Sequence, residues 1–211
     1  MQANLKQRII TSSLLFILLL ASFLNNYVFG YVLIVAGIFS LLEFFGITKI
    51  FLKKNKTLEL FLNLVFITYI FIFCTIVIYL SSLYYLKILI FIILLACVAS
   101  DIGGYTFGKF FKGPKLTKIS PNKTIAGAFG AVFCCTLFLV FCFYYLTKNF
   151  DLNVFISGVT TSIGCQIGDL FFSYLKRKSN LKDTGNFLPG HGGILDRVDG
   201  MLIGIPIGFL T

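Results

Sequence analysis

Long apolar runs, separated by short polar segments, follow one another along the chain. Because the hydrocarbon core of a bilayer is about 30 Å thick, a helix needs about 20 apolar residues to cross it. The shortest run is the last one, which contains Pro206 and predicts a short or tilted helix. The pattern predicts an all-α polytopic membrane protein with about seven transmembrane helices, at residues 8–24, 27–47, 59–80, 86–107, 126–147, 153–174 and 198–211.

Composition excludes a soluble or a disordered protein. Of the 211 residues, 58% are hydrophobic and only 12% are charged, with a mean hydropathy of +0.95. Soluble domains carry about 25% charged residues. Disordered chains are poor in aromatic residues, whereas this chain has 26 Phe and 10 Tyr.

The distribution of the basic residues predicts the topology. If the seven runs alternate across the membrane, every Lys and Arg except Lys87 and Lys148 falls on one side. The positive-inside rule then puts the N-terminus and two long basic loops, residues 108–125 and 175–197, in the cytoplasm. The first run is followed by Asn25 rather than by a small-residue cleavage site, so it is expected to stay as a helix. The net charge is +10, and the basic residues that produce it lie between the apolar runs. This placement favours lipid headgroups and phosphorylated substrates as partners rather than nucleic acid.

A polar stripe runs along the sixth apolar segment. At its centre is Asp169, an acid that costs about 2.5–3.5 kcal/mol inside a membrane-spanning helix. Polar residues that only join helices by hydrogen bonds would give a similar stripe. The acid at the centre instead favours the interpretation that the stripe forms one wall of a hydrophilic cleft open to cytoplasm and lipid. The stripe, spaced for one helix face, consists of Ser162, Gln166, Asp169, Ser173 and Lys176.

Most of the remaining acids lie in or beside the two basic loops. Glu43, Glu59 and Asp151 are expected to be solvated or interfacial groups. Asp101, Asp183, Asp196 and Asp199 belong to the basic loops or their edges. Asp196 and Asp199, three residues apart, would share a face of a helix, either as partners of the helix dipole or as metal ligands.

Two further segments have features typical of phosphate-binding sites. After Asp101, the glycines of Gly104-x-x-x-Gly108 allow another backbone or a phosphate to come close. Ser120, Lys123 and Thr124 then precede a helix whose N-terminus can hold an anion, although a basic loop can also simply bind lipid headgroups. These observations divide the chain into N-terminal helices, 1–85, and a catalytic region, 86–211, within one membrane unit.

The residue types favour magnesium and a polyphosphate. Carboxylates, with one His and with cysteines only inside apolar runs, suit Mg²⁺ rather than zinc. Many Lys and Arg around such a site imply a polyphosphate, and a cleft open to both cytoplasm and lipid implies one water-soluble substrate and one lipid substrate. Phosphoryl or nucleotidyl transfer to a lipid follows from this combination.

Residues 173–199 carry a family resemblance. The run S-x-L-K-R-x4-K-D-x-G-x2-L-P-x-H-G-G-x2-D-R-V-D resembles the signature of the CDP-diacylglycerol synthase (phosphatidate cytidylyltransferase) family. The resemblance extends to the segments around Asp101, Lys123 and Asp169 and covers about the second half of the chain. It implies that phosphatidate attacks the α-phosphate of CTP, which gives CDP-diacylglycerol and pyrophosphate at the cytoplasmic face of the cell's inner membrane.

The resemblance also implies roles for individual residues. Asp169 and Asp196 would hold Mg²⁺, with a second cation such as K⁺ nearby, and the protein would form a homodimer. The catalytic set would be Asp169, Asp196, Asp199, Lys182, His191 and Arg197. The substrate-binding set would be Asp101, Ser120, Lys123, Thr124, Ser173, Lys176, Arg177 and Asp183.

One departure and two alternatives accompany this interpretation. Ile125 and Ala126 stand where the family usually has an aromatic residue and a Glu. A CTP-using lipid kinase would share the basic loops and the acid in a helix, but has no reason to carry the whole signature. A non-enzyme, such as an anion channel or transporter, would need polar groups in the outer halves of the spans, which are almost uniformly apolar.

Overall fold

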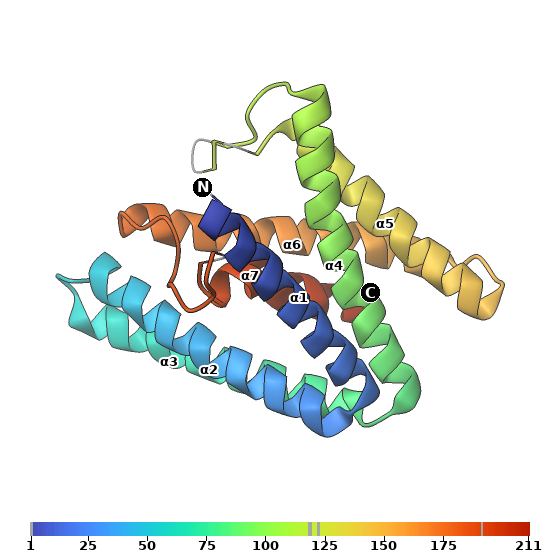
Figure 1. Cartoon of the computed structure of the whole chain (residues 1–211), viewed down its shortest axis with the longest axis horizontal. Coiled ribbons are helices and arrows are strands. Elements are labelled where there is room, and N and C mark those ends of the chain that lie inside the picture. The colour runs from blue at the N-terminus through green and yellow to red at the C-terminus, as the bar shows by residue number, and fades with distance from the viewer. Residues whose placement is uncertain (1, 118–119, 122, 191) are drawn as a thin grey trace. The chain divides into compact units, whose positions relative to one another are not determined.

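The protein is all-helical, as the sequence predicts. The computed structural model describes residues 2–117, 120–121, 123–190 and 192–211, and within these residues seven helices form and no β-strand beyond two isolated bridges (Figure 1). The helices are α1 (Gln2–Leu24), α2 (Asn26–Phe51), α3 (Lys56–Ser81), α4 (Tyr84–Phe111), α5 (Ile125–Thr147), α6 (Leu152–Lys178) and α7 (Leu195–Leu210).

Six helices of the described chain, α1 to α6, are long and apolar enough to cross a membrane. The seventh predicted span corresponds to α7, whose 16 residues leave it outside this group. The prediction of a multi-pass membrane protein is therefore supported, with six rather than seven helices meeting the requirement by length and composition.

Most helices extend beyond the apolar runs that predicted them. The sixth run was expected to end at residue 174, but α6 continues to Lys178 and includes Lys176. The seventh was expected to begin at residue 198, but α7 begins at Leu195, so that Asp196 lies in its first turn. Hydropathy locates the part of a helix that meets lipid, whereas the helix itself continues as long as its backbone hydrogen bonds do.

The chain divides into two compact units. Unit 1 comprises residues 1–87 and 175–198, and unit 2 comprises residues 88–174 and 199–211. The division of the sequence into 1–85 and 86–211 was based on chemistry rather than on packing, and it stays a prediction.

In unit 1, α2 packs against both α1 and α3 (Figure 1). Between α2 and α3, the rings of Phe44 and Phe66 stack with their centroids 4.0 Å apart. One turn further along α2, the Thr48 hydroxyl donates a hydrogen bond of 2.7 Å to Asn63 Oδ1. These contacts fix the half of α2 that follows Glu43.

In unit 2, α4 and α5 pack with their backbones in contact. A Cβ atom on Gly103 would lie 2.6 Å from the carbonyl oxygen of Gly130, and one on Gly127 would lie 2.6 Å from that of Gly104. Only glycine allows this approach. The glycines after Asp101 therefore admit a neighbouring helix, which is one of the two interpretations that the sequence left open.

Glycines also bring α6 and α7 together within unit 2. A Cβ atom on Gly168 would lie 2.5 Å from the Asp199 carbonyl oxygen and 3.0 Å from Gly200 Cα. One on Gly164 would lie 3.1 Å from Gly204 Cα. Contacts between small residues replace the hydrophobic effect as the source of helix association in lipid, and here they place Asp169 beside α7.

Candidate functional site

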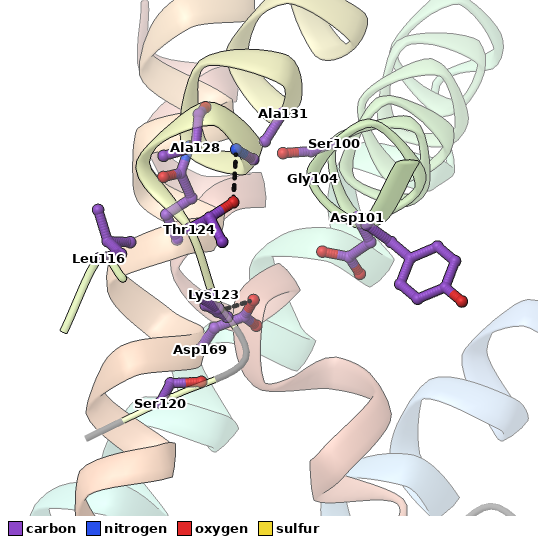
Figure 2. Close-up of a pocket in the computed structure, with 13 residues that line it drawn as sticks. Ser100, Asp101, Gly104, Leu116, Ser120, Lys123, Thr124, Ala128, Ala131 and Asp169 are labelled. Carbon is purple, nitrogen blue, oxygen red and sulfur yellow. Dashed lines mark hydrogen bonds and ion pairs between the residues drawn. The ribbon is translucent and has the colours of Figure 1, made fainter. Parts of the chain in front are cut away.

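A pocket in unit 2 brings several of the predicted site residues together. Its volume is about 290 Å³, and α4, α5, α6 and the loop before α5 contribute to its wall (Figure 2). Small-molecule sites in proteins begin at about 300 Å³, so the pocket can hold part of a nucleotide or a headgroup. The predicted site residues that line it are Asp101, Ser120, Lys123, Thr124 and Asp169.

The pocket contains an ion pair between the loop and α6. Lys123 Nζ lies 2.7 Å from Asp169 Oδ2, with 31% of the lysine side chain and 22% of the aspartate side chain exposed (Figure 2). An unpaired aspartate inside a membrane-spanning helix would be expensive. The pair offsets this cost and keeps both charges beside the pocket.

Local hydrogen bonds hold Lys123 at the start of α5. The Thr124 hydroxyl accepts from the backbone N–H of Gly127 at 3.1 Å, which makes Thr124 the N-cap of the helix. The carbonyl oxygen of Lys123 accepts from Leu116 N at 2.8 Å, so the loop folds back on itself. Lys123 therefore lies next to the positive end of the α5 dipole.

The polar stripe of α6 has two functions. Ser162 shares a hydrogen bond of 2.8 Å with Ser100 of α4, and Gln166 donates to the Ala128 carbonyl of α5 at 3.3 Å. These two residues join helices, as the structural interpretation of the stripe expected. Asp169 instead pairs with Lys123, whereas Ser173 is half-buried and does not line the pocket.

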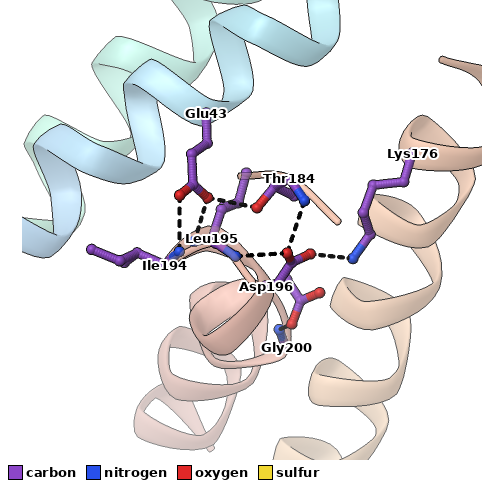
Figure 3. A network of polar contacts seen from close by, with 9 residues as sticks. Glu43, Lys176, Thr184, Ile194, Leu195, Asp196 and Gly200 are labelled. Carbon is purple, nitrogen blue, oxygen red and sulfur yellow. Dashed lines mark hydrogen bonds and ion pairs between the residues drawn. The ribbon is translucent and has the colours of Figure 1, made fainter. Parts of the chain in front are cut away.

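Unit 1 contains a second, more buried ion pair. Lys176 Nζ lies 2.6 Å from Asp196 Oδ1, and only 12% and 7% of the two side chains are exposed (Figure 3). Asp196 Oδ2 also accepts from the backbone N–H groups of Thr184, at 2.8 Å, and Gly193, at 3.1 Å. Burial alone would raise the pKa of Asp196, but the Lys176 ammonium and these N–H groups hold it below its usual value.

Glu43 belongs to the same cluster, and the expectation that it is a solvated or interfacial group is wrong. Its carboxylate accepts from the Thr184 hydroxyl at 2.5 Å and from the backbone N–H groups of Ile194 and Leu195, each at 2.9 Å (Figure 3). The available signal was its position inside the apolar run 27–47. The same criterion had singled out Asp169.

The side chains of Asp183 and Asp196 both lie close to Gly192, a glycine of the signature. Gly192 has a φ of +82°, a conformation that other residues adopt only with strain. A Cβ atom there would lie 3.1 Å from Asp196 Oδ2 and 3.5 Å from Asp183 Cγ. Glycine therefore lets the loop turn closely around both acids.

The other predicted residues are distributed over both units. Asp199 is half-buried in α7, within unit 2, and its Oδ1 accepts from the backbone N–H of Gly200 at 2.9 Å. The prediction for His191 concerns a residue outside the described part of the chain. The exposed members of the predicted set in unit 1 are Arg177, Lys182, Asp183 and Arg197.

The donor set is compatible with magnesium bound together with a phosphorylated substrate. Within the described part of the chain, no group of three His, Cys, Asp or Glu side chains gathers as metal ligands. Mg²⁺, however, is commonly held by one or two carboxylates and by substrate phosphates. Asp196 is kept ionised and Asp169 is paired with a cation, so each offers carboxylate oxygen of the required kind.

Comparison with known proteins identifies the family. The chain is 45% identical to the phosphatidate cytidylyltransferase of Staphylococcus aureus over 112 residues, 51% of this chain and 42% of that protein. It is 42% identical to that of Helicobacter pylori over 113 residues (53% and 42%), and 40% identical to that of Mycobacterium leprae over 124 residues (54% and 36%). The match thus spans less than half the length of each of these relatives. Residues 3–211, nearly the whole chain, match the cytidylyltransferase family, and the protein therefore belongs to it.

Proposed function

We propose that this protein transfers the cytidylyl group of CTP to phosphatidate, which gives CDP-diacylglycerol and pyrophosphate. The observation that carries the proposal is the family match over residues 3–211, together with relatives that are each named phosphatidate cytidylyltransferase. The two lysine–aspartate pairs give this activity a physical basis, because they combine cations for phosphates with carboxylates for a metal ion.

In the proposed reaction, an oxygen of the phosphatidate phosphate forms a bond to the α-phosphorus of CTP. The bond between that phosphorus and the oxygen bridging to the β-phosphate breaks, and pyrophosphate leaves with the electron pair. Phosphatidate is already anionic, so no strong general base is required. The chain's main contribution is to place two anions side by side, for which Lys123, Lys176, Arg177, Lys182 and Arg197 supply positive charge.

Asp169 and Asp196 are the residues that we propose to hold Mg²⁺. When bound, the metal ion would neutralise charge on the phosphates and on the leaving pyrophosphate. Lys123 and Lys176 each pair with one of these carboxylates and orient it before substrate arrives. The second cation, such as K⁺, is part of the proposal as well.

The remaining parts of the proposal concern the surroundings of the protein. The basic loops 108–125 and 175–197 favour a cytoplasmic active site in the inner membrane of the cell, with a polar cleft open to cytoplasm and lipid. A homodimer is the proposed assembly. Crosslinking in the native membrane tests the assembly, and labelling of single cysteines at Lys115 and Asp151 from either side tests the orientation.

A labelling experiment with purified protein in detergent tests the activity. With phosphatidate, Mg²⁺ and CTP labelled at the α-phosphate, the label is expected in CDP-diacylglycerol, and with CTP labelled at the γ-phosphate, in pyrophosphate. Removing Mg²⁺ with a chelator abolishes the reaction, and adding it back restores it. Asp169→Asn removes one proposed metal ligand and is expected to reduce turnover at least about 100-fold.

Asp151→Asn is the matched control for this experiment. It is the same chemical change at the residue immediately before α6, and its side chain accepts from the backbone N–H of Asn153, a role that Asn can also fill. It is expected to keep full activity. Lipid labelled from the γ-phosphate would instead identify a lipid kinase, and no transfer from either label by folded protein would refute the proposed activity.

A further inference from the structure

We propose that Glu43 is a positioning residue of the active site, which holds both ends of residues 184–195 and through them the Asp196 carboxylate. The proposal rests on the proposed function only for its effect on turnover. Its structural part concerns unit 1 alone and can be tested without activity.

Glu43 connects two places in the chain that lie ten residues apart. At the first end, the Thr184 hydroxyl donates to Glu43 Oε2. At the second end, Ile194 N donates to Oε1 and Leu195 N to Oε2. Three donors thus converge on one carboxylate, and hydrogen bonds to a charged acceptor are about twice as strong as neutral ones.

The sequence leaves the start of α7 in need of such a group. The first N–H groups of a helix have no partner within the helix, and a preceding Ser, Thr, Asp or Asn usually accepts from them. Here the residue before Leu195 is Ile194, whose side chain cannot accept. Glu43 fills this role from another helix, and its negative charge also suits the positive end of the α7 dipole.

Two glycines of the signature make room for Glu43. A Cβ atom on Gly193 would overlap both Glu43 Oε2 and Thr184 Oγ1, and one on Gly185 would lie 2.8 Å from Glu43 Oε1. Both positions therefore have to be glycine as long as Glu43 occupies this place. The contact with Glu43 thus explains why the signature has glycine at positions 185 and 193, where a residue without a side chain cannot contact a substrate through one.

Other contacts of the N-terminal helices hold the same loop. One turn before Glu43 on α2, the ring of Phe39 lies 3.8 Å from that of Phe187 between centroids. From α1, Arg8 Nε donates to the Gly190 carbonyl at 3.1 Å. Helices that carry no residue of the signature therefore hold its loop at the middle as well as at its ends.

The contacts of Glu43 determine where Asp196 lies. Thr184 joins the two acids directly, since its hydroxyl donates to Glu43 and its backbone N–H donates to Asp196 Oδ2. Leu195, held by Glu43, is the residue immediately before Asp196. A displacement of the Glu43 carboxylate would therefore also displace Asp196, both through Thr184 and through Leu195.

Glu43→Gln tests the proposal because it keeps the size of the side chain and replaces an accepting oxygen by a donating NH2 group. Hydrogen exchange of purified protein in detergent is expected to become at least about tenfold faster at residues 193–197, where the helix start loses acceptors. The affinity for Mn²⁺, measured by electron paramagnetic resonance, is expected to fall about tenfold, as for other residues that orient a metal ligand. For the same reason, the Mg²⁺ concentration for half-maximal turnover is expected to rise about tenfold. The KM for phosphatidate should stay unchanged.

Glu59→Gln is the matched control, because Glu59 lies in the first turn of neighbouring α3 and takes no part in this cluster. It is expected to leave all four readouts unchanged. If Glu43→Gln does not fold, Thr184→Val carries the test: it replaces the hydroxyl by a methyl group of similar size, so the same shifts are expected at about threefold, while Thr184→Ser behaves as wild type.

Two results would overturn the proposal. One is unchanged hydrogen exchange at residues 193–197 in the folded variants. The other is activity that falls only with the amount of folded protein, with unchanged Mn²⁺ and Mg²⁺ midpoints. Inactive wild-type protein would refute the proposed function instead, and hydrogen exchange and Mn²⁺ binding would still decide on Glu43.

Discussion

Removing Lys176 is expected to destabilise the protein far more than removing Lys123, although both lysines pair with an aspartate. Lys176→Met keeps the aliphatic part of the side chain and deletes only the charge. The two pairs have similar lengths, 2.6 Å and 2.7 Å, but the Lys176 pair is 12% and 7% exposed and the Lys123 pair 31% and 22%. Water can replace a lost partner only where it has access.

The magnitude follows from this difference in exposure. Breaking a buried pair by removing one partner costs about 3–5 kcal/mol, and Asp196 retains two backbone hydrogen bonds on Oδ2, so a value of about 3 kcal/mol is expected for Lys176→Met. Pairs with access to solvent contribute about 0.2–1 kcal/mol. Lys123→Met should therefore cost about 1 kcal/mol.

The effect of pH gives a second, independent signature. The pKa of Asp196 lies below the ordinary value of 3.8 because of its partners, so its contribution to stability is present above pH 3.8 and is lost as the pH falls through the lower, folded-state value. In Lys176→Met, burial is no longer opposed by the lysine, and the pKa of Asp196 rises. The difference in stability between the two proteins is therefore complete at neutral pH and shrinks as the pH falls from the raised Asp196 pKa of the variant towards the lower pKa of the wild type.

The assay is reversible unfolding in mixed micelles of dodecylmaltoside and increasing SDS, followed by circular dichroism at several pH values. Lys49→Met is the control, since Lys49 is an exposed residue in the last turn of α2. It is expected to change the free energy of unfolding by less than about 0.5 kcal/mol. Equal losses for Lys176→Met and Lys123→Met, or a difference that persists unchanged in acid, would refute the reasoning.

Two further predictions concern local structure. Gly130→Ala should destabilise the protein by about 1–3 kcal/mol, because the new Cβ would overlap the side chain of Phe107, whereas Gly46→Ala on an open face of α2 should be neutral or stabilising by up to about 1 kcal/mol; the same SDS titration compares them. Thr124→Val should cost about 1 kcal/mol by removing the acceptor for Gly127 N, and Thr124→Ser should cost little. Equal stability of the two glycine variants, or of the two Thr124 variants, would contradict these contacts.

The fold and half of the candidate site could be predicted from local sequence. Apolar runs identify helices because a bilayer demands apolar side chains over a known length. Asp169 could be singled out because an acid inside such a run is costly unless it has a function. Its pairing with Lys123 lay beyond the sequence, since 46 residues separate the two and no periodicity relates a loop to a helix.

The contribution of Glu43 shows what local reasoning misses. Its partners lie 141 to 152 residues away along the chain, so only the packing of α2 beside the signature loop shows what it binds. The start of α7 was placed three residues too late for a related reason. Asp196 and Arg197 are polar, yet Asp196 accepts hydrogen bonds at a helix start, where acids are favoured.

The two lysine–aspartate pairs have a thermodynamic consequence for ligand binding. Each pair carries no net charge, because the lysine and the aspartate neutralise each other. A ligand of one charge has to break the pair, whereas two ligands of opposite charge together can give both side chains a new partner. A triphosphate that takes Lys123 or Lys176 releases a carboxylate, and a divalent cation that takes the carboxylate releases the lysine. If the proposed nucleotide and cation bind at these pairs, their affinities are linked: whatever factor the nucleotide adds to the affinity for the cation, the cation adds to that for the nucleotide. Either ligand alone would bind poorly, because it strands half of a pair.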